Sequence, residues 1–265
     1  MPVEQHLTDR NLALELVRVT EAGALAAARL VGRGEAVSAM RIAFQSVHIR
    51  GTVIIGEGEK DHAPMLYNGE AVGYGDGPEI DIAVDPVEGT NAVAYGRPNG
   101  LAVIGCTPKG GMFNPGRSYY CKKLVVGKEA ANVIDLDAPV ADNLKKIAFA
   151  LGKPVSELNI FVLDKPRHVG LINDIRIAGA RIHLYTDGDV AGALMAADPR
   201  HQMDVLMGIG GTPEAVITAC ALKGTGAQML TRLNPLSDEE RKNIEADGIS
   251  IDTIRSIDDL ITSNE

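Results

Sequence analysis

The stretch "NIFVLDKPRHVGLINDIRIAGARIHLYTDGD", residues 159–189, alternates short apolar runs with a longer mixed segment. The runs "NIFVL" and "RIHLY" are typical of β-strands, and "VGLINDIRIAGA" between them has the spacing of a helix that ends at glycine. The same rhythm continues through "VAGALMAA", "MDVLMGIGG" and "PEAVITACALKG", which favour helix, strand and helix. This alternation predicts an α/β protein with a parallel or mixed sheet covered by helices.

The chain before this stretch is richer in strands. The short runs "GTVII", "EIDIAV", "LAVIGC" and "YYCKKLVVG" are bounded by Gly and Pro, which predicts strands. Helices are expected in "TDRNLALELVRVTEAGALAAARLVGRG", "AVSAMRIAFQSVHI", "VADNLKKIAFALGKP" and "SDEERKNIEADG". In the last of these, Ser237 and Glu240 have the spacing of a capping box. We therefore expect a strand-rich half over residues 1–139 and a βα half over residues 140–265.

The composition narrows the possible partners and compartment. The chain has 265 residues, 45% of them hydrophobic, and a formal net charge of −9. An acidic chain is a poor general binder of nucleic acid or anionic membranes, so neither is expected as a partner. The three cysteines are far apart and form no CxxC pair, which favours buried thiols in a reducing compartment. With no apolar run near ~18 residues and no signal-peptide pattern, a soluble cytoplasmic protein is expected.

Polar side chains collect where the predicted strands end. The run "GTVII" is followed by "GEGEKD", "EIDIAV" by "DPVEGTN", "NIFVL" by "DKPRH", "RIHLY" by "TDGD", and "MDVLMGIGG" by "TPE". In open α/β sheets, ligands bind beyond the carboxyl ends of the strands. These polar segments are therefore the candidate functional site.

Each segment alone also has a purely structural explanation. The segments "GEGE" and "DGD" could be solvated turns and "DKPRH" a basic loop, while "TPE" is a good helix start, with Thr212 as the cap and Pro213 in the first position. The segment "DPVEGT" is the hardest to explain in this way, because a turn does not need Asp, Glu and Thr directly after a buried strand. The recurrence of polar residues at several strand ends favours a functional site.

The residue types suit metal-assisted phosphate chemistry. Mg²⁺ and Mn²⁺ prefer carboxylate and carbonyl oxygens, and Asp85 and Glu88 could face one such ion. The Thr90 hydroxyl could orient an attacking water. Lys165 and Arg167 supply the positive charge that would hold a second anionic group. The sequence thus predicts a phosphate ester that carries a second phosphate.

Taken together, these segments resemble a known family. The segment "DPVEGT" is similar to the Asp-Pro-x-(Asp/Glu)-Gly-Thr signature of the lithium-sensitive, metal-dependent sugar and inositol phosphatase superfamily. The segments "RVTEAGALAA", "IGEGEKDHAPMLYNGE", "DIAVDPVEGTN", "KPRH", "TDGDVAGA" and "GIGGTPEAVI" resemble the class II fructose-1,6-bisphosphatases of bacteria, from about Asp9 to Glu265. The resemblance implies a layered α-β-α-β-α sandwich with two mixed sheets, and a homo-oligomer, either a dimer or a tetramer.

The resemblance also implies a reaction and a site. The reaction is hydrolysis of the 1-phosphate of fructose 1,6-bisphosphate to fructose 6-phosphate in gluconeogenesis, with Mg²⁺ or Mn²⁺, and some relatives also cleave sedoheptulose 1,7-bisphosphate. The implied catalytic residues are Thr90 and Glu59. The implied metal ligands are Glu57, Asp85, the Val87 carbonyl, Glu88 and Glu214. The implied substrate-binding residues are Glu88, Gly89, Thr90, Tyr120, Lys165, Arg167, Asp187, Asp189 and Gly210, with Gly211 admitting the ligand to the backbone.

The chain departs from the family pattern in two places. In the family, the segment after "GRG" and an acidic residue carries a lysine and an aspartate of the metal site, whereas here Glu35 runs directly into Ala36. The family also continues beyond "ITSNE" with further strands. We favour the interpretation that the sequence joins segments of a longer protein. If the deletion is real, hydrolysis is expected to be weak or absent, because the aspartate partnered with Thr90 is missing.

Two other functions fit parts of the sequence. An inositol-monophosphatase-like enzyme of the same superfamily would not need "DKPRH" to hold a second phosphate. A catalytically silent sugar-phosphate-binding or regulatory protein is supported only by the missing segment after Glu35. A phosphotransferase is disfavoured, because the chain has no GxxxxGK[ST] loop and no set of kinase motifs.

Overall fold

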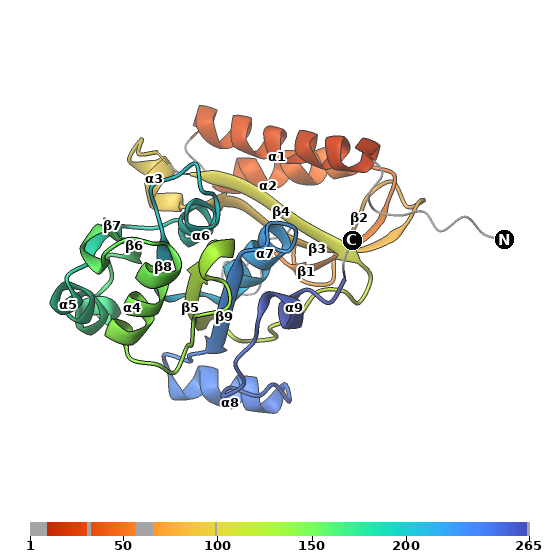
Figure 1. The fold of residues 1–265 in the computed structure, drawn as a ribbon. Coiled ribbons are helices and arrows are strands. Elements are labelled where there is room, and N and C mark those ends of the chain that lie inside the picture. The colour runs from red at the N-terminus through yellow and green to blue at the C-terminus, as the bar shows by residue number, and fades with distance from the viewer. Residues whose placement is uncertain (1–9, 31–32, 57–65, 99, 264–265) are drawn as a thin grey trace. The chain divides into compact units, whose positions relative to one another are not determined.

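The chain forms two compact units. A computed structural model describes residues 10–30, 33–56, 66–98 and 100–263 (Figure 1). The first unit consists of Met1–Asn114 and Ile261–Glu265, and the second of Pro115–Leu260. The end of the chain returns to the first unit through an antiparallel bridge between Ile261 and Met112.

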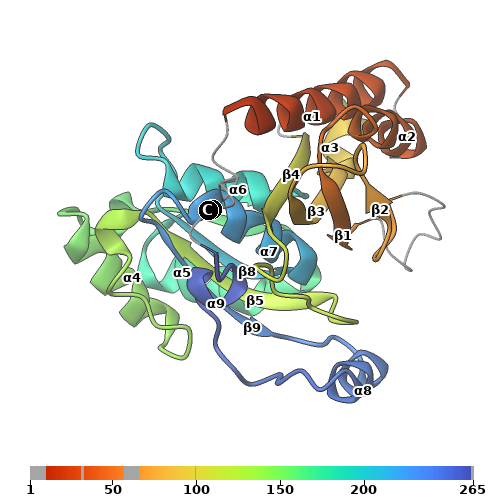
Figure 2. The ribbon, with the colours of Figure 1, turned by 90° about the vertical axis from the view of Figure 1, so that its right-hand side faces the viewer.

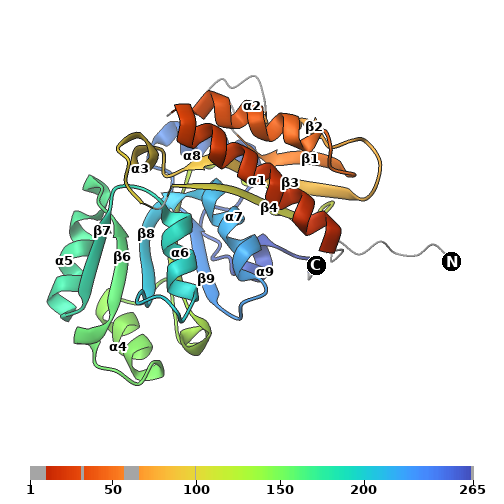
Figure 3. The same ribbon diagram turned by 90° about the horizontal axis from the view of Figure 1, so that it is seen from above.

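The first unit contains a mixed four-stranded sheet in the order β2-β1-β3-β4. Its strands β1 and β3 run parallel, β2 pairs antiparallel with β1, and β4 pairs antiparallel with β3. The elements are α1 (Arg10–Leu30), α2 (Arg33–Phe44), β1 (Arg50–Ile55), β2 (Ala71–Val72), β3 (Glu79–Glu88), α3 (Thr90–Ala94) and β4 (Leu101–Pro108). Seen from above, α1 and α2 lie side by side over this sheet (Figure 3).

The core of the first unit lies between these two helices and the sheet. Val19 of α1 and Met40 and Phe44 of α2 are buried together with strand residues such as Ile82. Gly23 lets the helices approach closely, because a Cβ at this position would lie only 2.7 Å from Met40 Cγ. This packing fixes the sheet whose central strand carries the acidic segment.

Strand β3 is longer than the sequence predicts. The apolar run was expected to stop at Asp85, but the strand continues to Glu88, with a shift in its register against β4 between these two residues. Pro86 has no N–H to give to the ladder, so an irregularity at this point is expected. As a result, Glu88 is held by the sheet rather than by a loop.

The second unit contains a mixed five-stranded sheet in the order β7-β6-β8-β5-β9. Strands β6, β7 and β8 are parallel, and β5 runs antiparallel to both β8 and β9. Helix α8 lies beyond the end of β9 (Figure 2). The strands and α-helices are β5 (Tyr120–Val126), α4 (Val140–Ala150), β6 (Asn159–Leu163), α5 (Val169–Ala178), β7 (Arg181–Tyr185), α6 (Asp189–Ala197), β8 (Val205–Gly211), α7 (Thr212–Leu222), β9 (Gln228–Leu233), α8 (Asp238–Ala246) and α9 (Ile257–Leu260). The 3₁₀ turns are η1 (Lys128–Ala130), η2 (Val155–Glu157) and η3 (Pro166–His168).

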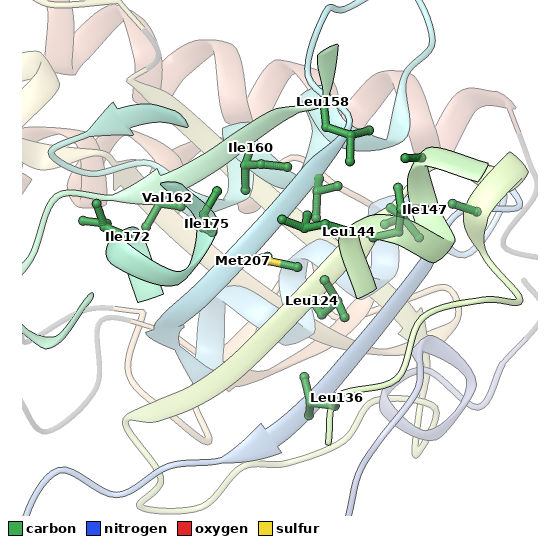
Figure 4. Packing of buried hydrophobic residues seen from close by; sticks show 14 residues of the cluster. Leu124, Leu136, Leu144, Ile147, Leu158, Ile160, Val162, Ile172, Ile175 and Met207 are labelled. Carbon is green, nitrogen blue, oxygen red and sulfur yellow. The ribbon is translucent and has the colours of Figure 1, made fainter. Parts of the chain in front are cut away.

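Helices cover both faces of the second sheet. On one face, Leu144 of α4 and Ile175 of α5 point toward strand residues such as Ile160 and Met207 (Figure 4). Helix α6 packs on the other face, where Gly192 lies against the ring of Phe161. This follows from the two-residue period of a strand, which places neighbouring residues on opposite faces.

The structure confirms the α/β class with two mixed sheets and covering helices. The second unit begins at Pro115, whereas the sequence placed the division at about residue 139. The difference arises because β5 pairs with β8 and β9, which lie much later in the chain. Within the described part of the chain, no helix is both long and apolar enough to cross a membrane.

Candidate active site

Asp85, Val87 and Glu88 meet at the register shift in β3. The Val87 amide donates a hydrogen bond to Asp85 Oδ1 at 3.0 Å, which directs the Asp85 side chain toward the residues that follow it in the strand. Glu88 is buried, with only 3% of its surface exposed. This short segment therefore presents two carboxylates and a carbonyl, the oxygen donors that Mg²⁺ and Mn²⁺ prefer.

Thr90 is held directly against this segment. Its hydroxyl donates to the Val87 carbonyl oxygen at 3.2 Å. Gly89, just before it, has a φ of 79°, the left-handed conformation that glycine adopts most readily. The turn thus joins the predicted catalytic hydroxyl to one of the predicted metal ligands.

Two predicted acidic residues cannot be placed. Glu57 and Glu59 lie outside the described residues. In the sequence they follow β1, the parallel neighbour of β3. Among the residues that the structure describes, no three His, Cys, Asp or Glu side chains form a group that could hold a metal ion. In the first unit, the described candidates for metal ligands are therefore Asp85, Val87 and Glu88.

The predicted substrate residues of the second unit lie at one edge of its sheet. Because β6, β7 and β8 are parallel, the residues that follow them gather at a common carboxyl edge. Antiparallel β5 begins at the same edge, where Tyr120 pairs with Gly211. Lys165 follows β6 and Asp187 follows β7, and the Lys165 Nζ lies 3.1 Å from Asp187 Oδ1.

Arg167 lies beside Tyr120 at this edge. Its guanidinium carbon sits 5.3 Å from the centre of the Tyr120 ring, a distance at which a cation is attracted to the aromatic face. Its Nε and Nη2 donate to the Ile209 carbonyl at 3.0 and 2.9 Å. A phosphate could accept hydrogen bonds from the other three N–H groups of the guanidinium.

Lys123 belongs to this region and is absent from the residues that the sequence predicted. Its Nζ lies 2.6 Å from Asp189 Oδ2, and the two side chains are 3% and 8% exposed. Burial alone would lower the pKa of Lys123, but attraction to Asp189, Cys121 and Glu214 outweighs it and raises the pKa above the ordinary 10.5. Lys123 is therefore a buried cation. The one feature of the sequence that could have indicated this is its place inside the apolar run "YYCKKLVVG".

Two glycines admit carboxylates to the end of β8. A Cβ on Gly210 would overlap Asp189 Oδ2, and a Cβ on Gly211 would overlap Glu214 Oε2. The sequence predicted that these glycines admit a ligand, and the structure places two of the predicted site carboxylates against them. The structural explanation of "TPE" named Thr212 as the helix cap, and this is wrong. The cap of α7 is Gly211, and the Thr212 hydroxyl lies 3.1 Å from Ser118 Oγ.

These features define a class of protein. The first sheet carries a segment of acidic oxygen donors at the end of a strand, and the second sheet carries a lysine and an arginine at its carboxyl edge. An α/β phosphatase needs both features to bind and hydrolyse a phosphate ester.

Comparison with known proteins gives the family. A family model described as bacterial fructose-1,6-bisphosphatase, glpX-encoded, matches residues 10–265. The chain is 43% identical over 275 residues to fructose-1,6-bisphosphatase 2 class 2 of Escherichia coli strain K12, covering 96% of this chain and 85% of the relative. It is 46% identical over 243 residues to fructose-1,6-bisphosphatase 1 class 2 of the same strain, covering 89% and 72%. The chain belongs to this family of bacterial phosphatases.

Proposed function

We propose that this chain hydrolyses the 1-phosphate of fructose 1,6-bisphosphate, giving fructose 6-phosphate and inorganic phosphate for gluconeogenesis. The observation that carries the proposal is the family match over residues 10–265. Lys165 and Arg167 support a substrate with a second phosphate, because they place two cationic side chains at the carboxyl edge of one sheet.

From the family resemblance, we assign the role of Mg²⁺ or Mn²⁺ ligand to each of Asp85, Glu88, the Val87 carbonyl, Glu57 and Glu214. The described donors are all oxygens, and one carboxylate is buried, which fits a hard divalent cation. When bound, such a cation stabilises the charge on the phosphate and makes a water more acidic. Asp85 and Glu88 hold their oxygens in fixed positions through the strand and its register shift.

The remaining residues orient the reactants. Thr90, anchored on the Val87 carbonyl, orients the attacking water, and Glu59 assists it. The Gly89 amide binds an oxygen of the phosphate that is cleaved.

The far end of the substrate binds in the second unit. Lys165 and Arg167 bind the 6-phosphate, and Tyr120 supports the guanidinium of Arg167. Asp187 binds the sugar and also holds the ammonium of Lys165. The sugar rests against Gly210, beside which Asp189 is fixed by its ion pair with Lys123.

If the departure after Glu35 is a real deletion, it predicts weak or absent hydrolysis. By the family resemblance, the aspartate that would pair with Thr90 is absent from this chain. For a chain that truly lacks this segment, we therefore expect hydrolysis that is weak or absent beside that of the two E. coli relatives in the same assay. A kcat equal to theirs would show that the missing segment contributes nothing to catalysis.

The test is phosphate release from fructose 1,6-bisphosphate by the wild type and a Lys165→Ala/Arg167→Ala variant. The proposal predicts a large increase in KM, with a Lys145→Ala/Lys146→Ala variant on α4 as the control. An unchanged KM would favour the inositol-monophosphatase-like alternative. Binding without turnover, with metal present, would favour a silent sugar-phosphate-binding protein.

Four finer properties belong to the same proposal. Sedoheptulose 1,7-bisphosphate, which differs in its sugar but also carries two phosphates, is a second substrate to assay. Inhibition by Li⁺ would support membership of the lithium-sensitive superfamily. We also propose a homo-oligomer, a dimer or tetramer measurable by light scattering, and a cytoplasmic location, which the three free cysteines support.

A further inference from the structure

His168 ends the cluster "KPRH", and the proposed function gives it no role. It is the last residue of η3, directly after the phosphate-binding Arg167. Only 2% of its surface is exposed, so the ring itself is not placed to bind the substrate. A buried histidine between two strands needs hydrogen-bond partners for its ring nitrogens.

Both ring nitrogens of His168 have backbone partners. The Ile209 amide donates to Nε2 at 2.7 Å, and Nδ1 lies 2.7 Å from the Leu163 carbonyl oxygen. An amide can only donate and a carbonyl can only accept, so Nε2 is the acceptor and Nδ1 carries the proton. The neutral ring therefore bridges the end of β6 to β8.

Arg167 binds the other side of the same backbone residue. Its Nε and Nη2 donate to the Ile209 carbonyl, while His168 accepts from the Ile209 amide. Strands β6 and β8 are paired only at Ile160–Val205 and Phe161–Leu206. Beyond that point, two consecutive side chains of η3 make the connection that a strand ladder would otherwise make.

Gly208 makes room for the ring. Its φ is 142°, in the region that favours glycine. A Cβ at this position would lie 2.9 Å from His168 Nε2 and 3.0 Å from Cε1. The absence of a side chain at Gly208 thus lets the imidazole lie against β8, where its Nε2 accepts the hydrogen bond from the Ile209 amide.

We propose that His168 is a positioning residue for the phosphate that is not cleaved. By tying η3 to β8 through Ile209, it holds the Arg167 guanidinium in the place where the phosphate binds. This inference rests on the proposed function of Arg167. It assigns His168 to substrate affinity and not to the chemical step.

Two substitutions separate the two hydrogen bonds. Nδ1 is bonded directly to Cγ, so the amide of His168→Asn reaches the position of Nδ1 and keeps the bond to Leu163. Nε2 lies one atom further out, so the amide oxygen of His168→Gln can still accept from Ile209. The matched control is His183→Asn, because His183 is exposed and its Nε2 bonds Asn159.

The measurement is the Kd of fructose 6-phosphate, the product that carries only the far phosphate, by titration calorimetry. We expect His168→Asn to weaken binding about tenfold, through the loss of a buried hydrogen bond. His168→Gln and His183→Asn should bind within about threefold of the wild type. In the hydrolysis assay, His168→Asn should raise KM and leave kcat within about twofold.

Equal affinity in all variants would overturn the inference. It would also be overturned if His168→Asn and His168→Gln lost the same affinity and that loss followed the fall in their melting temperatures. If neither variant folds, Gly208→Ala replaces them, since its Cβ would push the ring off the Ile209 amide. A wild type that binds fructose 6-phosphate with this pattern but releases no phosphate would refute the proposed hydrolysis and keep the inference. A wild type that does not bind fructose 6-phosphate would refute the inference.

Discussion

Lys123→Met should be severely destabilising, because it leaves a buried carboxylate without its cation. Lys123 Nζ and Asp189 Oδ2 are 2.6 Å apart, with the side chains 3% and 8% exposed. Methionine has a similar length and no charge, so the change removes the ion pair with little loss of volume. The pair joins β5 to the start of α6 at the sheet edge that carries the proposed substrate site.

Removing one partner of a buried ion pair costs about 3–5 kcal/mol. At about 2–4 °C per kcal/mol for a chain of this size, the melting temperature should fall by about 6–20 °C. The control is Lys145→Met, whose ammonium lies 3.8 Å from Asp142 with side chains 72% and 55% exposed. An exposed pair of this kind is worth under about 0.5 kcal/mol.

The assays are thermal and urea denaturation of the wild type, both single variants and Lys123→Met/Asp189→Asn. The double variant should be more stable than Lys123→Met, because the carboxylate charge is removed together with its cation. If Lys123→Met unfolds at the same urea concentration as Lys145→Met, the buried charge pair does not stabilise the second unit and the reasoning is wrong.

Three further perturbations test separate parts of the structure. Gly211→Ala should raise the Mn²⁺ concentration needed for half-maximal hydrolysis, because its Cβ would displace the Glu214 carboxylate, whereas Gly224→Ala has open space around it and should have no effect. Ser237→Ala should lower the free energy of unfolding by about 1 kcal/mol, measured by urea denaturation, because its Oγ accepts from the Glu240 amide at the start of α8. Burial lowers the pKa of His168 below its ordinary 6.5, so the unfolded chain takes up the proton first as the pH falls. The free energy of unfolding should therefore decrease as the pH drops through about 6.5, and His168→Gln should remove that part of the slope.

Local patterns were enough to predict most of the elements. The alternation from "NIFVL" onward gives β6, α5, β7, α6, β8 and α7 in that order, because burial imposes a period of 2 on strands and about 3.6 on helices. The first half of the capping box at Ser237 also formed, with Oγ accepting from the Glu240 amide at 3.1 Å, while the Glu240 carboxylate accepts from the neighbouring Leu236 amide. Strand β9, in "QMLTRL", was not assigned.

The candidate site was predictable where it follows from strand order. The strand-end rule brought Lys165 and Asp187 to one edge, and the structure joins them by an ion pair. It could not show that Asp189 would pair with Lys123, because the two residues are 66 positions apart and meet only when β5 enters the second sheet. The bridging role of His168 was hidden for the same reason, since its partner Ile209 lies 41 positions away.

Glu240 shows how one side chain can serve a role beyond its local motif. Its carboxylate accepts from the amides of Tyr119 and Tyr120 at 2.7 and 3.1 Å, and from the Leu236 amide at 2.9 Å. The capping-box spacing predicts only the local pairing with Ser237. The contacts to the start of β5 depend on the tertiary fold, which brings α8 to the residue that stacks with Arg167.

The central claim is that Asp85 delivers a ligand to a divalent cation that the hydrolysis requires. The most direct measurement is phosphate release from fructose 1,6-bisphosphate with Mg²⁺, with Mn²⁺ and with chelator, for the wild type, Asp85→Asn and the exposed control Asp252→Asn. The account predicts release that needs the metal, is lost in Asp85→Asn and is kept in Asp252→Asn. Release that persists in chelator, or an Asp85→Asn variant as active as the wild type, would contradict it.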